Sequence, residues 1–94
     1  MAHETTSWSA LDHLDTPAEQ AAYLDAALDD GDPNLVAAVI GDIARARGLA
    51  RFALETGIEP RTIELTFRAD GNPSLDSITR VARVLGLRLK LVAA

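Results

Sequence analysis

Apolar residues recur at helical spacing along most of the chain, and capping residues divide them into short segments. Thr16-Pro17-Ala18-Glu19 fits a capping box that begins a helix, and Gly31 is its expected end. Asp32 and Pro33 begin a second helix at once, which is predicted to end at Gly48. Helical spacing predicts that eight apolar residues of these two helices face inward. They are Ala22, Leu24, Leu28, Leu35, Val36, Val39, Ile40 and Ile43.

Two shorter helices are predicted around Gly57, within residues 49–67. Small Ala53 lets two helices cross closely, Gly57 takes the backbone conformation of a tight turn, and Ile63 gives the second helix an inner face. After a dense turn at 70–73, Ser74 caps a last helix that is expected to end at Gly86. Its expected inward-facing positions are Leu75, Ile78, Val81, Ala82 and Leu85.

Residues 87–92 alternate between leucine and a basic residue over most of their length, which is the period of a strand. Such a strand either pairs with the same strand of a second subunit or packs its leucines on the domain. We therefore predict an all-α five-helix bundle with a helix-turn-helix and a short C-terminal β-strand. The chain is predicted to be one domain over 1–94, with a peripheral segment at 1–15, a helical pair at 16–48, the helix-turn-helix and following helix at 49–86, and the strand at 87–92.

Composition argues against catalysis. The chain has no cysteine, and His3 and His13 have no third histidine near them, so we expect no metal, no cofactor and no enzyme activity. The N-terminus does not have the pattern of a signal peptide, and no apolar run approaches the length of a membrane span. We therefore expect a cytoplasmic protein that does not bind membranes.

Charge is distributed unevenly along the chain. Residues 1–44 carry nine acidic residues and no lysine or arginine, whereas residues 45–94 carry nine basic and five acidic residues. The two parts therefore have net charges of −9 and +4. This polarity suits a protein that offers one face to DNA and another to a basic protein, although a solvated acidic surface is the simpler alternative.

Several motifs together resemble the HigA-like addiction-module antidote proteins, within the phage-repressor-type helix-turn-helix class. The resemblance covers about residues 8–92. It is carried by Pro17 with Glu19, Tyr23-Leu24, Gly31-Asp32-Pro33, Gly41–Gly48, Glu55-Thr56-Gly57, Gly71-Asn72-Pro73-Ser74 and Leu85-Gly86-Leu87. The resemblance implies a homodimeric antitoxin of a type II toxin–antitoxin system, which neutralises a small basic RelE/ParE-like, mRNA-cleaving toxin and represses its own operon on double-stranded operator DNA.

In that interpretation the second short helix enters the major groove of the operator. Arg61 and Thr62 would read bases, and Leu65 would contact a thymine methyl group. Arg47, Arg51 and Arg68 would bind phosphates.

Two alternatives remain open on the sequence alone. One is a transcriptional regulator of phage-repressor type without a toxin partner. The other is a protein-only antitoxin with weakened DNA binding. The second short helix favours the latter, because Glu59-Pro60 and Glu64-Leu65 stand where the family often has Ser-Arg and Tyr-Lys.

Overall fold

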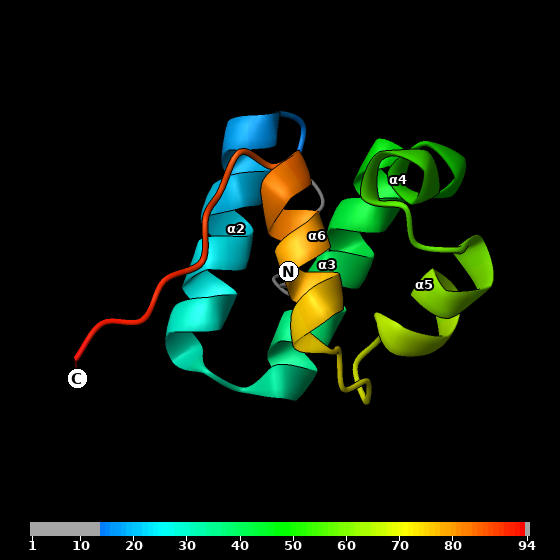
Figure 1. Cartoon of the computed structure of the whole chain (residues 1–94). Coiled ribbons are helices and arrows are strands. Elements are labelled where there is room, and N and C mark those ends of the chain that lie inside the picture. The colour runs from blue at the N-terminus through cyan, green and yellow to red at the C-terminus, as the bar shows by residue number, and fades with distance from the viewer. Residues whose placement is uncertain (1–13, 94) are drawn as a thin grey trace, which may run out of the picture.

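A computed structural model describes residues 14–93 of the chain. Within these residues it contains five α-helices and no strand (Figure 1): α2 (Pro17–Asp30), α3 (Pro33–Arg47), α4 (Leu49–Thr56), α5 (Pro60–Thr66) and α6 (Leu75–Val84). The prediction of an all-α fold is confirmed. Residues 1–13, which include His3, His13 and most of the predicted peripheral segment, lie outside the described residues.

The starts of α2, α3 and α6 are set by the side-chain caps that the sequence predicted. Thr16 and Glu19 form a complete capping box, in which the Glu19 amide donates to Thr16 Oγ1 over 3.1 Å and the Thr16 amide donates to Glu19 Oε1 over 3.0 Å. Asp32 accepts from the Asn34 amide at 2.9 Å, and Ser74 accepts from the Ser77 amide at 3.1 Å. These bonds satisfy amides that a helix start leaves without an intrahelical partner.

Helix α3 is the centre of the packing, because it contacts α2, α4 and α5. Val39, Ile40 and Ile43 point from α3 into a core that also holds Phe52 and Val81, all five completely or almost completely buried. Helix α5 lies very close to α3: a Cβ atom placed on Gly41 would be 2.3 Å from the Phe67 carbonyl oxygen. Glycine is therefore required at position 41 by the approach of two backbones.

Some inward-facing positions were predicted wrongly. Leu75 is 72% exposed, and Ala22 and Leu35 are also exposed. All three lie in the first or second turn of their helices, at the margin of the apolar stripe. At these positions helical spacing allows burial, but no neighbouring helix lies over the side chain.

The predicted C-terminal strand is not confirmed in the described residues. Gly86 has a φ of 76°, and the Leu87 amide donates to the Ala82 carbonyl oxygen over 2.8 Å, which closes the end of α6. Residues 87–93 then continue without regular secondary structure beside α2 (Figure 1). Leu87 and Leu89 are half-buried and Arg88 and Lys90 are exposed, so the alternation does place the leucines toward the domain. A ladder does not form because the described residues contain no second strand.

Candidate functional site

Helices α4 and α5 form a tight corner at one side of the molecule (Figure 1). Gly57 ends α4 with a φ of 74°, and its amide donates to the Ala53 carbonyl oxygen over 2.9 Å. The buried Thr56 hydroxyl donates to the Phe52 carbonyl oxygen over 2.8 Å and accepts from the Ile58 amide at 3.2 Å. The turn is therefore held by its own hydrogen bonds, and Ile63 anchors α5 in the core.

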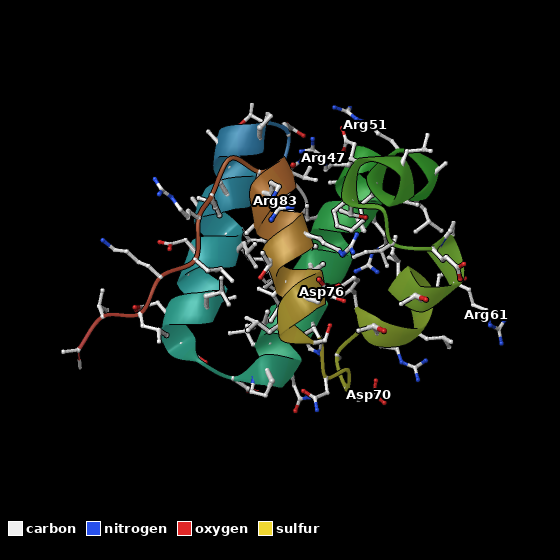
Figure 2. All side chains as sticks on the ribbon, in the orientation of Figure 1. Arg47, Arg51, Arg61, Asp70, Asp76 and Arg83 are labelled. Carbon is white, nitrogen blue, oxygen red and sulfur yellow. The ribbon has the colours of Figure 1, made fainter. Side chains whose placement is uncertain are left out.

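The three predicted base-reading residues all lie on the exposed side of α5. Arg61, Thr62 and Leu65 are each exposed, and Leu65 keeps 53% of its surface accessible. Figure 2 shows Arg61 directed away from the body of the protein. Leu65 follows Arg61 by four residues and Thr62 by three, so the three side chains are neighbours on the helix surface. None of them is covered by its own subunit in the described residues.

Arg47 has a different environment. Its side chain is only 8% exposed, and its Nε atom lies 3.0 Å from Glu55 Oε1. Its Nη1 atom also donates to the side-chain oxygen of Gln20, which is itself buried. Because these bonds join α2, α3 and α4, Arg47 would have to leave two partners to reach a phosphate.

Glu55 responds to these contacts. The hydrogen bond from Arg47 is the main cause that lowers the pKa of the Glu55 carboxyl below its ordinary value of 4.5. Arg51 adds to this effect through its Nε atom, 3.0 Å from Glu55 Oε2, while burial opposes it. Glu55 is therefore ionised at neutral pH and is shared by two arginines.

Arg51 and Arg68 are the accessible arginines among the three predicted phosphate ligands. Arg51 is exposed on α4 (Figure 2) and pairs with Glu55, and Arg68 is exposed after α5 with its Nε atom 3.2 Å from Asp70 Oδ1. Exposed ion pairs contribute little to stability, at most about 1 kcal/mol, so both arginines can exchange these partners.

The α4–α5 corner is not basic. The net charge of +4 over residues 45–94 did not reveal this, because it averages the corner with the segments around it. Residues 49–70 contain three arginines and four acidic residues, a net charge of −1. Four of the nine basic side chains of residues 45–94 lie on α6 and in the segment after it, at Arg80, Arg83, Arg88 and Lys90. Leu54, which the sequence interpretation did not single out, is 86% exposed on α4. Its position two residues from buried Phe52, a rotation of about 200° on a helix, was the available signal.

No group of three or more potential metal ligands is present in the described part of the chain. No helix there has the length and apolarity needed to cross a membrane.

The fold and the paired charges fit a small binding protein, and comparison with known proteins specifies the class. Residues 4–93 match the model of a family described as "Probable addiction module antidote protein", and the chain belongs to this family. The description suggests a regulatory, non-enzymatic role and implies a toxin as partner. The chain is also 26% identical over 91 residues to an uncharacterised protein of Haemophilus influenzae, covering 97% of this chain and 94% of that protein. No solved structure matches the chain significantly.

Proposed function

We propose that this protein is the antitoxin of a type II toxin–antitoxin module and neutralises a small basic toxin of the RelE/ParE-like, mRNA-cleaving class by forming a complex with it. The match of residues 4–93 to the antidote family is the observation that carries this proposal. Charge supports the choice of a basic partner, because residues 14–44 hold seven acidic residues and no lysine or arginine. Six of the seven are exposed or half-exposed on α2 and its flanking turns, and Asp42 lies on α3.

The test is co-expression of this protein with the small basic protein that is encoded next to its gene. We expect a stable complex on size-exclusion chromatography and suppression of the partner's mRNA cleavage in a cell-free translation assay. A neighbour that cleaves mRNA equally well with and without a molar excess of this protein would contradict the toxin role.

We further propose that the antitoxin is a homodimer that binds its own operator through the α4–α5 corner, acting as a helix-turn-helix of the phage-repressor, HigA-like type. The exposed, contiguous side chains of Arg61, Thr62 and Leu65 support base contacts from α5, with Arg51 and Arg68 on phosphates. Arg47 would act chiefly by holding α4 in place. A mobility-shift titration with the upstream DNA at low salt tests this, with Arg61→Ala as the variant and Arg45→Ala, at an exposed position on α3, as the charge-matched control. We expect only the first substitution to abolish the specific shift.

A protein-only antitoxin is the second candidate. The net charge of −1 over residues 49–70 favours it, because phosphate contacts supply much of the affinity for DNA. The same titration separates the two functions: toxin neutralisation without any shift at low salt would leave the interaction-only antitoxin.

A further inference from the structure

An open apolar groove of about 950 Å³ lies between α2, α6 and the C-terminal segment, which we define as residues 87–93. Leu28 of α2, Leu75 and Ala82 of α6, and Leu87 and Leu89 of the C-terminal segment line it. The end of the segment leaves the body of the protein (Figure 1), and Leu91, at the edge of the groove, is 100% exposed. The groove and the exposed Leu91 beside it form one apolar surface that a partner can cover.

We propose that the groove binds the C-terminal segment of a second copy of this chain, reciprocally, so that Leu91 of each copy inserts beside Leu28 and Leu75 of the other. The inference names the surface of the proposed homodimer and rests on that part of the proposed function alone. A two-fold arrangement fits, because each copy carries both the groove and the segment that fills it, and reciprocal contacts of this kind close at two subunits.

Charge complementarity identifies a second copy as the occupant. Arg88 and Lys90 are exposed on the C-terminal segment, and neither has an ion pair within residues 14–93. Asp25 and Asp29 are exposed on α2 within three residues of groove-lining Leu28, also without an ion pair in the described part of the chain. A C-terminal segment entering the partner's groove therefore carries its cations toward the partner's acidic helix.

Pairing of the two C-terminal segments as an antiparallel ladder is disfavoured by the same charges. The register centred on Leu89, which pairs Leu87, Leu89 and Leu91 with leucines of the other copy, places Arg88 of one copy opposite Lys90 of the other. Like charges directly opposite each other across a ladder are destabilising. Docking against α2 and α6 avoids this repulsion and buries the leucines.

The first test is the mass of the purified full chain by sedimentation velocity at micromolar concentrations. We expect a dimer, and we expect Leu91→Asp to raise its dissociation constant about tenfold or more, because a charge would replace a buried leucine. Leu54→Asp is the matched control, because Leu54 is 86% exposed on α4 and does not line the groove. The dissociation constant of the Leu54→Asp dimer should equal that of the wild type. Both leucines are exposed in the single chain, so neither substitution removes a core contact, and circular dichroism checks the fold.

A charge exchange provides the second test. We expect two charge variants to be monomeric, namely Arg88→Glu/Lys90→Glu and Asp25→Lys/Asp29→Lys. In a homodimer of either variant, the C-terminal segment of each copy would face α2 of the other copy with charges of the same sign. Mixed in equal amounts, they should form a heterodimer, because both grooves of the mixed pair then join opposite charges. Only a reciprocal interface gives this result.

Three results would overturn the inference. A wild-type chain that is monomeric at these concentrations would remove both the proposed homodimer and this interface. A Leu91→Asp variant that dimerises as well as the wild type would leave the homodimer but place its interface elsewhere. A wild-type monomer that becomes a dimer on deletion of residues 1–13 would show that the chain's own N-terminal segment occupies the groove.

Discussion

The Arg47 side chain is only 8% exposed and joins three helices, whereas Arg51 reaches the same carboxylate from the surface. We expect Arg47→Ala to destabilise the protein by about 1–3 kcal/mol, because the buried Gln20 oxygen loses its donor. Arg51→Ala removes only an exposed pair and should cost at most about 1 kcal/mol. Urea unfolding of both variants followed by circular dichroism measures the difference. Equal losses would mean that burial of Arg47 contributes nothing.

Glu55 gives this cluster a pH dependence. A carboxyl whose pKa is lower in the folded chain stabilises the fold above its unfolded pKa, and this contribution is lost as the pH falls through the folded pKa. The stabilising contribution of Glu55 should therefore be complete above its ordinary value of 4.5 and decline below it. The urea midpoint of the wild type should fall on acidification below that value, and Glu55→Gln should show a smaller fall. An identical decline in both proteins would assign the acid sensitivity to other carboxyl groups.

Gly41 is a residue at which helix propensity and packing predict opposite outcomes. In an exposed helix interior, replacing glycine with alanine stabilises by about 1 kcal/mol. At position 41 the new Cβ atom would lie 2.3 Å from the Phe67 carbonyl oxygen, so α5 must move away from α3. We expect Gly41→Ala to lower stability by about 1–3 kcal/mol, as overpacked substitutions do. Ala46→Gly on the exposed side of α3 is the control for propensity, and thermal unfolding of both variants reports the result.

At the scale of the elements, helix boundaries were predictable from sequence because capping bonds join residues only two to four positions apart. Thr16, Asp32 and Ser74 form the bonds that their residue types predict. The wrong predictions concern contacts between distant segments. Helical spacing places Leu75 on the apolar side of its helix but does not reveal whether another helix covers it. The number of arginines in the sequence likewise does not reveal that Arg47 of α3 contacts Gln20 of α2.

The α4–α5 corner shows the same limit for the candidate site. Its local geometry followed from Ala53, Gly57 and Ile63, and the exposure of Arg61, Thr62 and Leu65 matches the predicted outward face of α5. The partners of Arg51 and Arg68 depend on how side chains meet after folding, so no sequence pattern specified them.

Acidic Glu64 limits the affinity of α5 for DNA if the corner is the operator interface. It is exposed and follows Arg61 by three residues, so its carboxylate lies beside the side chain that would read bases and close to the negatively charged DNA. Glu64→Lys should strengthen operator binding and steepen its dependence on salt by about one phosphate contact, a slope change of about 0.9 in a log–log plot. Asp30→Lys makes the same charge change at the end of α2 and should have a smaller effect. Equal effects of the two substitutions would indicate a nonspecific response to net charge.

At the scale of the whole molecule, acidic and basic side chains are concentrated on different elements of the described chain. Helix α2 carries only acidic charged residues, while α6 and the C-terminal segment carry four of the nine basic residues and one acidic residue. One small chain can therefore attract a basic protein over the acidic face of α2 and still carry basic side chains on α6 and the C-terminal segment.

This separation makes the proposed toxin complex sensitive to ionic strength in a defined way. Long-range attraction between oppositely charged faces accelerates association, and the Debye length shortens from about 10 Å at 0.1 M salt to about 3 Å at 1 M. We expect the association rate with the toxin to fall about tenfold or more over that range, while the dissociation rate changes little. Surface plasmon resonance with immobilised toxin measures both rates. Leu91→Asp, which prevents the proposed pairing without altering α2, should show the same salt dependence as the wild type. A fall confined to the wild type would mean that the toxin binds the dimer interface, and salt-independent association would mean that the acidic face of α2 does not guide the encounter.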